Sequence, residues 1–293
     1  MSVINTNITA LIGQNNLSNS QSMLAKSQER LSSGLRINSA SDDAAGQAIA
    51  NKMSAQIKGM DQASRNASDG ISLVQTMEGG LDQINDNLGR IRELAVQGAS
   101  DTNTDEDRAA IETEINERLE EIDRVANSNN FNGTDLLNGG GSGGLSIQVG
   151  SNTEDEDVIE VATVDATVSG LGLSGGGISG SEFTAGDSDD ATATSGSTAQ
   201  QNFQSLIDSV DSATTELDTN RATLGATLNR FDSVIDNLST TSTNLSEARS
   251  RIEDADYAEE VSNMTRSNIL QQAGTSMLAQ ANQTPQSVLS LLG

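Results

Sequence analysis

Apolar residues recur every seven positions along two long stretches of the chain. Between about residues 45 and 99 the repeat consists of Met53, Met60, Ala67, Val74, Leu81, Leu88 and Ala95. Between about residues 200 and 247 it consists of Phe203, Val210, Leu217, Leu224, Phe231, Leu238 and Leu245. A seven-residue apolar repeat is typical of the seam of a coiled-coil-like helix. We therefore predict two long helices, each with one narrow apolar stripe.

Glycines interrupt the first of these helices without ending it. Interior glycines such as Gly70 and Gly80 each cost about 1 kcal/mol relative to alanine. Neighbouring elements must therefore support this helix.

A third helix is predicted over about residues 105–128. Its apolar positions are three or four residues apart, the spacing of one helix face: Ile111, Ile115, Leu119, Ile122 and Val125. Three acidic residues at 105–107 stand at its start, where the helix dipole favours negative charge. Helices that each carry one apolar stripe bury these stripes against one another. We therefore expect a mainly α fold, a long coiled-coil-like bundle that pairs N-terminal and C-terminal segments.

The pattern between residues 129 and 200 is that of loops and short strands. Leu145, Ile147 and Val149 alternate with polar residues, and residues 158–168 are rich in β-branched side chains. This predicts a small β-hairpin closed by the acidic turn at residues 152–157.

The rest of this middle region is expected to lack regular structure. Residues 129–138 are interpreted as a loop, and the Gly/Ser-rich stretches 139–144 and 170–180 as flexible linkers. Residues 175–198 are expected to be either a small exposed insertion or a partly disordered loop. The acidic run 154–157 could bind calcium through oxygen ligands, but it lacks the glycine and the spacing of an EF-hand loop, which favours a solvated turn.

Charged side chains are absent from both ends of the chain, residues 1–25 and 267–293. Burying a charge is costly, whereas buried amides and hydroxyls can satisfy one another. Apolar residues recur at helical spacing in both ends: Ile4, Ile8 and Leu11, then Ile269, Ala273 and Met277. We predict that the two ends pack together as helices in an assembled state. The alternative is a pair of neutral disordered tails.

The composition argues against an enzyme. Cysteine and histidine are absent, and only 34% of the residues are hydrophobic. The usual Ser-His, Cys-His and His-zinc sites cannot be built. We predict no catalytic residue, no cofactor and no metal site.

The formal net charge is −26, from 16 basic and 42 acidic residues. Such a chain repels phosphate backbones and anionic lipid headgroups, so neither nucleic acid nor membrane is an expected partner. Residues 125–220 contain no Lys or Arg, so this stretch is expected to face water. Lys26, Lys52 and Lys58 are the only lysines, which fits either a saline habitat or simply a well-solvated surface.

Three sequence motifs lie near the N-terminus, in the first long helix and near the C-terminus: residues 31–38 with 42–46, residues 91–97, and residues 248–257 with 269–283. These motifs resemble those of bacterial flagellins. The resemblance implies a subunit that polymerises into the flagellar filament for swimming motility. It also implies secretion by the flagellar type III apparatus, which fits the lack of a signal-peptide pattern. A hook–filament junction protein and a secreted coiled-coil adhesin remain as alternatives.

The resemblance divides the chain into three parts. It implies an inner filament-core domain of residues 1–40 plus 250–293. A long-helix bundle with the hairpin follows, of residues 41–174 plus 199–249, and residues 175–198 form the exposed insertion. In many flagellins the insertion carries further domains, which the short insertion here leaves minimal or missing.

The resemblance also suggests functional residues and partners. Polymerisation would involve apolar residues of both ends: Ile4, Ile8, Leu11, Leu17, Leu24, Leu31, Ile269, Met277, Val288, Leu289 and Leu292. Arg90, Leu94 and Glu114 match positions that an innate Toll-like receptor reads in some flagellins, with subunit contacts as the alternative role. The implied partners are further copies of the chain, the filament cap protein, the hook–filament junction protein and an export chaperone that binds the C-terminus.

Overall fold

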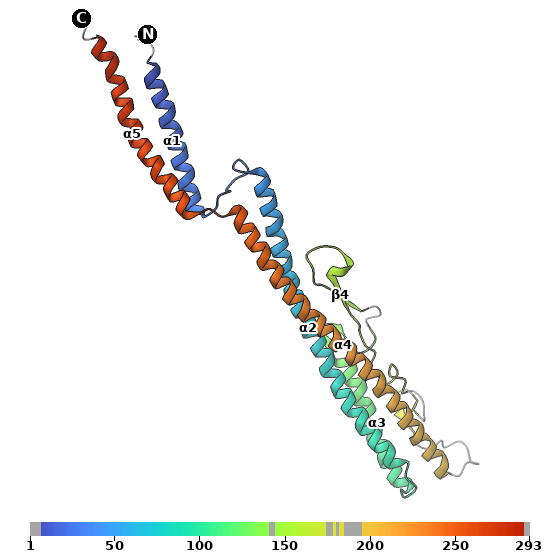
Figure 1. The fold of residues 1–293 in the computed structure, drawn as a ribbon. Coiled ribbons are helices and arrows are strands. Elements are labelled where there is room, and N and C mark those ends of the chain that lie inside the picture. Colours follow the sequence, from blue (N-terminus) through green and yellow to red (C-terminus); the bar gives the residue numbers. More distant parts are fainter. Residues whose placement is uncertain (1–6, 141–143, 174–177, 180–181, 185–194, 290–293) are drawn as a thin grey trace. The chain divides into compact units, whose positions relative to one another are not determined.

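The computed structural model describes residues 7–140, 144–173, 178–179, 182–184 and 195–289; for residues 178–179, 182–183, 195–198 and 284–289 it describes the backbone alone. The described chain is mainly helical, as predicted (Figure 1). Its five long helices are α1 (Ile8–Ser33), α2 (Ala44–Gly98), α3 (Asp105–Ser128), α4 (Ser195–Glu253) and α5 (Tyr257–Leu289). The chain forms two compact units, which we call unit 1 (Met1–Lys58 with Ser242–Gly293) and unit 2 (Gly59–Thr241).

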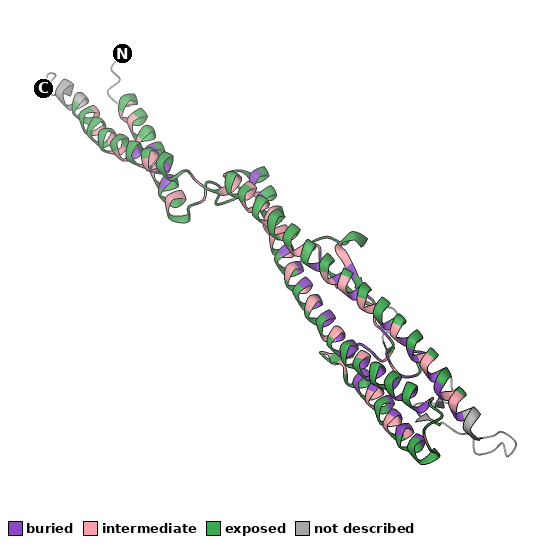
Figure 2. Ribbon diagram, turned by 60° about the horizontal axis from the view of Figure 1, so that its bottom comes forward, coloured by how far each residue is buried: buried purple, intermediate pink, exposed green. Residues whose placement is uncertain are grey.

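The apolar stripes of α2, α3 and α4 form the core of unit 2, visible as the buried positions in Figure 2. The contacts between α2 and α4 show that the two helices run antiparallel. Gly98 of α2 lies against Phe203, which is near the start of α4, and Gly70 lies against Phe231, further along α4. The predicted pairing of N-terminal and C-terminal segments is therefore confirmed.

Helix α3 has the bounds that its sequence predicts. Its five apolar stripe positions are all buried in the core of unit 2. The Thr104 side chain accepts a hydrogen bond from the Asp107 N–H, and the Asp107 carboxylate accepts one from the Thr104 N–H. This capping box satisfies backbone donors at the helix start. Thr104 therefore fixes where α3 begins.

The predicted hairpin is present in unit 2. Strand β3 (Leu145–Gln148) pairs antiparallel with β4 (Val158–Val161), and Leu145 lies opposite Val161. A 3₁₀ turn, η1 (Asp155–Asp157), lies between them. The Asp157 carboxylate accepts a hydrogen bond from the Asn152 N–H at 2.9 Å, so this acidic side chain closes the turn.

A second hairpin corrects the prediction of a loop at residues 129–138. Strands β1 (Asn130–Phe131) and β2 (Thr134–Asp135) pair antiparallel around Asn132 and Gly133. Both turn residues have positive φ, 51° and 82°, as the I′ turn of a two-residue hairpin requires. The Asn-Gly pair was therefore a readable hairpin signal.

A third strand pair lies in the predicted insertion. Strand β5 (Ile178–Ser179) pairs antiparallel with β6 (Glu182–Phe183). The stretch 170–180 was expected to be a flexible linker. Two of its residues, Ile178 and Ser179, form strand β5 instead. Residues 174–177, 180–181 and 185–194 of this region lie outside the described residues.

In unit 1, α1 and α5 lie side by side and antiparallel (Figure 1). The Asn7 side chain caps α1 by accepting from the Ala10 N–H, and its Nδ2 donates to the Ala281 carbonyl at 2.9 Å. The two chain ends, which are far apart in sequence, are therefore held together within one chain.

Candidate assembly surface

The seam between α1 and α5 mixes leucine and methionine with small and polar residues. The buried or half-buried seam positions are three or four residues apart on each helix: Ala10, Gly13, Leu17, Ser20, Leu24, Ser27 and Leu31 on α1, and Met264, Ser267, Gln271, Gly274, Leu278 and Ala281 on α5. Each glycine faces a leucine of the other helix, since a Cβ added to Gly13 would lie 3.6 Å from Leu278 and one added to Gly274 would lie 3.3 Å from Leu17. The helices therefore approach closely at the glycines, and the seam positions that are fully buried are serines, Ser20, Ser27 and Ser267.

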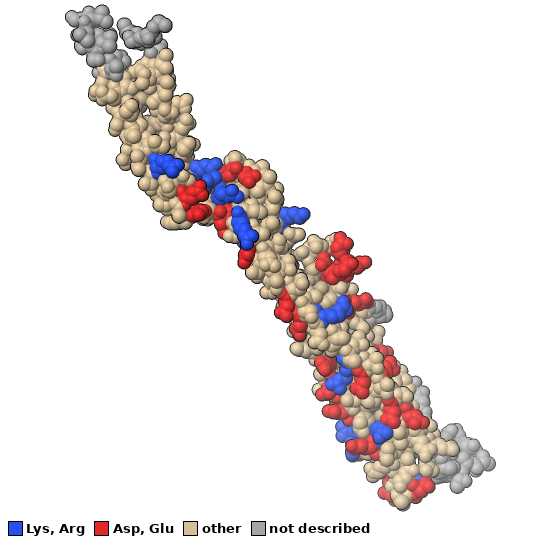
Figure 3. Space-filling view, viewed as in Figure 1, with Lys and Arg blue, Asp and Glu red and all other residues tan. Residues whose placement is uncertain are grey.

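Large apolar side chains of the same two helices lie outside this seam. We call this set the terminal apolar face: Ile8, Leu11, Ile12, Met23, Ile269, Leu270 and Met277, which are 47–67% exposed. A groove of about 460 Å³ runs between the helices and is lined in part by Ile12, Leu17, Leu270 and Met277. All seven residues lie in the two ranges without charged side chains, 1–25 and 267–293, and Arg266 borders Ile269 and Leu270. In the view of Figure 3 the far ends of the two helices show no blue or red atoms. An exposed apolar surface of this kind marks an interaction site.

The structure separates the predicted polymerisation residues into three groups. Leu17, Leu24 and Leu31 lie half-buried in the seam, whereas Ile8, Leu11, Ile269 and Met277 belong to the terminal apolar face. Val288 and Leu289 belong to α5, but only their backbone is described. Ile4 and Leu292 lie outside the described residues.

Sequence reasoning did not single out Ile12, Met23 and Leu270. Each is at least 47% exposed. Ile12 and Leu270 follow the predicted residues Leu11 and Ile269, whereas Met23 precedes Leu24 of the seam. Their signal was present in the charge-free ends of the chain, where any large apolar residue outside the seam is a candidate for contact with another molecule.

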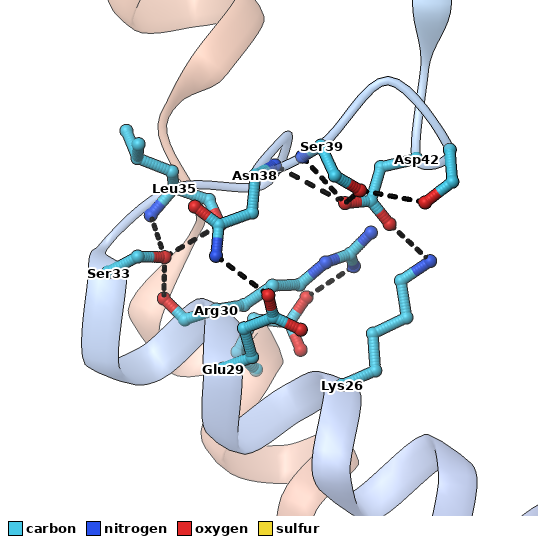
Figure 4. Close-up of polar contacts among 10 residues, drawn as sticks. Lys26, Glu29, Arg30, Ser33, Leu35, Asn38, Ser39 and Asp42 are labelled. Atoms are coloured by element: carbon cyan, nitrogen blue, oxygen red, sulfur yellow. Dashed lines mark hydrogen bonds and ion pairs between the residues drawn. The ribbon is translucent and has the colours of Figure 1, made fainter.

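An ion-paired cluster lies where the charge-free part of the helix pair ends (Figure 4). Lys26 Nζ lies 2.7 Å from Asp42 Oδ1, and Arg30 Nη1 lies 2.8 Å from Glu260 Oε1. The Lys26 contact is the main reason that the pKa of Asp42 is lowered to about 2. We call Lys26, Arg30, Asp42 and Glu260 the charged collar.

Backbone contacts reinforce the collar. Leu35 forms an isolated antiparallel bridge with Asp254, and the Ala255 N–H donates to the Gly34 carbonyl at 2.9 Å. Gly34 takes the left-handed conformation that ends α1, with φ of 74°. The collar therefore fixes how the chain leaves α1 and enters α5.

The three residues matched to a receptor contact lie in unit 2, in different environments. Arg90 of α2 pairs with Glu114 of α3 at 3.0 Å, and both side chains are about 40% exposed. Leu94 is 2% exposed and belongs to the core of unit 2. Arg90 and Glu114 thus form a surface site, and Leu94 supports the helix beneath it.

No helix in the described part of the chain is long and apolar enough to cross a membrane. The described residues also hold no group of three or more acidic side chains arranged to bind a metal ion.

Two family models match the chain. One describes the bacterial flagellin N-terminal helical region and matches residues 4–141, and the other describes the C-terminal helical region and matches residues 207–292. A flagellin of Xenorhabdus nematophila is 48% identical, and one of Halalkalibacterium halodurans is 43% identical; each alignment covers 99% of both chains.

Other relatives are longer than this chain or more distant from it in sequence. The flagellin of Salmonella typhimurium is 34% identical over 493 aligned positions, so it carries many residues without a counterpart in this chain of 293. A solved chain of Vibrio parahaemolyticus, described as a flagellar hook-associated protein, has a TM-score of 0.56 over 73% of this chain and 100% of its own, at 15% identity. That likeness concerns the fold alone.

Proposed function

Because the chain belongs to the bacterial flagellins, the structural subunits of the extracellular flagellar filament used for motility, we propose that the terminal apolar face is the surface through which its copies assemble. The observation that carries this proposal is the exposure of seven large apolar side chains on two helices, all of which lie in the charge-free ranges 1–25 and 267–293. Burying one such side chain fully stabilises a complex by about 1.5–3 kcal/mol.

The same contacts would decide how the polymer grows. Contacts between different surfaces of identical copies do not close into a ring when the rotation between copies fails to return to the start, and they then generate a helical filament. The hook–filament junction and adhesin alternatives are less well supported, because relatives named flagellin align over nearly the whole of both chains.

We further propose that α1 and α5 become ordered when a subunit joins the filament. Their seam contains Ser20, Ser27 and Ser267 at its buried positions, so it supplies little apolar burial against the entropy cost of ordering the two helices. The terminal apolar face would supply the missing burial once neighbouring copies cover it.

We also propose the three-part division of the chain. Residues 1–40 plus 250–293 would form the inner core of the filament, residues 41–174 plus 199–249 the next layer, and residues 175–198 the outer insertion. The gap between the two family matches, residues 142–206, contains this insertion and supports it as the variable part.

We propose further protein partners from the family resemblance and from the chemistry of the exposed side chains. An export chaperone that binds the C-terminus would cover the exposed apolar side chains of α5, and the cap and junction proteins would meet the same face at the filament ends. Arg90 and Glu114 are accessible to a Toll-like receptor, but their ion pair equally suits a contact between subunits, which we favour.

A triple variant tests the assembly surface. Leu11→Gln, Ile269→Gln and Met277→Gln replace side chains that are more than half exposed, so the thermal unfolding of the monomer should change little. The critical concentration for polymerisation, measured by sedimentation of seeded filaments, should rise at least about tenfold. The matched control is Val96→Gln, which alters a 52% exposed residue of α2 outside the face. Wild-type assembly by the triple variant would refute the proposal.

A further inference from the structure

Methionine is the chief oxidisable side chain of this protein. The chain contains seven methionines and a single tyrosine, but no cysteine, histidine or tryptophan. Oxidants attack the sulfur atoms of cysteine and methionine, and the first oxidation product of methionine, the sulfoxide, can be reduced again. Because thiols are absent, a peroxide that reaches this chain acts first on its methionines.

Exposure divides the methionines into two classes. Met23 and Met277 are 59% and 67% exposed, and both belong to the terminal apolar face. The other described methionines are half-buried or buried: Met53, Met60, Met77 and Met264. Met1 lies outside the described residues. The two most exposed thioethers of the described chain are therefore both part of the proposed assembly surface.

Oxidation changes what these two side chains offer to a neighbouring copy. The methionine sulfur gives an electron pair to one oxygen of hydrogen peroxide, so an S–O bond forms and the O–O bond breaks. The proton of the attacked oxygen passes to the departing hydroxide, which leaves as water, so sulfur is oxidised by two electrons and the peroxide is reduced. A flexible apolar side chain thereby becomes a polar one, which is costly to bury unless a hydrogen-bond donor meets its oxygen.

Apolar side chains line part of the groove that holds Met277. Ile12 and Leu270 line this groove together with Met277, and their side chains have no hydrogen-bond donor. The amides of Asn16 and Gln280 line the same groove and are able to donate to a sulfoxide oxygen. The effect of oxidation therefore has to be measured for each methionine of the face separately.

We propose that Met23 and Met277 are oxidation sites of the unassembled subunit, and that their sulfoxides block assembly until a reductase restores the thioethers. The oxidant is a peroxide. This inference rests on the proposed function, because a neighbouring copy that covers the terminal apolar face both requires the thioethers and shields them. Oxidation is therefore fast before assembly and slow afterwards.

Met264 offers a competing explanation. It lies in the seam between α1 and α5 and is half-buried in the described chain. If these helices become ordered only in the filament, as proposed, a peroxide also reaches Met264 in the free subunit, and its sulfoxide would act on the pairing of α1 with α5. The greater exposure of Met23 and Met277 in the helix pair, and their place on the surface between copies, favour the first explanation.

The first measurement maps the oxidation sites. The full chain is treated with hydrogen peroxide as free subunits or as filaments, and the sulfoxides are quantified by mass spectrometry of tryptic peptides. Trypsin separates Met277 from every other methionine, and fragmentation of the N-terminal peptide separates Met23 from Met1. In free subunits the two methionines of the face should react at least about tenfold faster than the core residues Met60 and Met77, and assembly into filaments should slow their reaction at least about tenfold.

The second measurement compares the critical concentration of seeded polymerisation before and after peroxide treatment of the same chain. For the wild type we expect a rise of at least about tenfold, which methionine sulfoxide reductases for both sulfoxide epimers should reverse. The double variant Met23→Leu with Met277→Leu has no sulfur on the face, so it should change less than about twofold from its own untreated value. The two single variants give the share of each methionine.

The matched control is the double variant Met53→Leu with Met264→Leu, which removes two half-buried thioethers. It keeps both methionines of the face, so peroxide should raise its critical concentration by the same factor as for the wild type. A control variant that resists peroxide would overturn the inference in favour of the seam.

Three further outcomes overturn the inference. The first is assembly of the oxidised wild type at its untreated critical concentration, with Met23 and Met277 both converted. The second is an equal loss of assembly in the double variant without these methionines. The third is equal oxidation of the two residues in free subunits and in filaments. Wild-type assembly by the untreated Leu11→Gln, Ile269→Gln and Met277→Gln variant counts against the proposed function instead, because the face would then not be the assembly surface.

Discussion

Two neighbouring glycines of α2, Gly79 and Gly80, lie in opposite surroundings. A Cβ at Gly80 would overlap the side chains of Asn129 and Leu137, whereas a Cβ at Gly79 would meet nothing within 4 Å. Close approach at Gly80 lets Asn129 Nδ2 donate to the Thr76 carbonyl at 3.1 Å, which ties the end of α3 to α2. The sequence identified Gly80 as a costly residue that needs support. It could not show which partner lies against it, because that partner is 49 residues away in the chain.

The glycine pair supplies a prediction at the residue scale. Gly80→Ala should lower the free energy of unfolding, because overpacking costs about 1–3 kcal/mol and the lost Asn129 hydrogen bond adds to this. Gly79→Ala should raise it by up to about 1 kcal/mol, the gain in helix propensity. Urea unfolding of the dilute monomer measures both. Equal effects of the two substitutions would show that the close contact at Gly80 has no energetic weight.

At the scale of elements, the apolar periodicity predicted the helices well. Turn residues were not used to predict the β1–β2 hairpin. Helix α3 has its predicted bounds, and α2 begins and ends within one residue of its prediction. Helix α4 begins at Ser195 and continues to Glu253, beyond the seven-residue repeat, because no glycine or proline follows Leu245 before its end. The β1–β2 hairpin was missed although Asn132-Gly133 is a specific turn signal.

The connection between α1 and α2 gives a prediction about pH. Asp42 accepts hydrogen bonds from the backbone N–H groups of Asn38 and Ser39, and its ion pair with Lys26 joins this connection to α1. Its pKa is lowered from 3.8 to about 2. The stabilisation it supplies is therefore fully present above pH 3.8 and is lost as the pH falls through about 2.

Nuclear magnetic resonance titration of the Asp42 carboxyl group in assembled filaments, in which we propose that α1 is ordered, measures this directly. Lys26→Met should move its pKa upward toward 3.8, because the hydrogen bond with Lys26 is the largest cause of the shift. Lys52→Met is the control, since Lys52 makes no ion pair in the described chain, and should leave the titration unchanged. An unchanged midpoint in the Lys26 variant would assign the shift to the backbone donors.

For the whole molecule, the distribution of charge in the sequence marked the α1–α5 pair more clearly than the apolar pattern did. The charge-free ranges, residues 1–25 and 267–293, cover most of α1 and most of α5. Periodicity could not separate Leu17, in the seam, from Leu11, on the terminal apolar face. That distinction depends on which helix lies alongside, which the periodicity of one helix does not encode.

Truncation tests whether the α1–α5 pair is needed for assembly while unit 2 folds without it. Deleting residues 1–40 removes α1 and leaves unit 2 intact, so we expect no polymer at any concentration, because half of the terminal apolar face is missing. The cooperative unfolding of unit 2, followed by circular dichroism, should persist within a few degrees of the full chain, since its core of α2, α3 and α4 is complete. Deleting residues 250–293 should act alike. Filaments of either truncated chain would show that assembly does not need the helix pair.

The stretch without lysine or arginine, which includes the β3–β4 hairpin, has a practical consequence. Trypsin cuts only after those two residues, and none occurs between Arg124 and Arg221. Complete digestion must therefore release residues 125–221 as one long peptide. Any sugar or other group attached to the middle of the chain would register as a mass change in that single fragment, so one peptide is enough to survey this acidic stretch for modification.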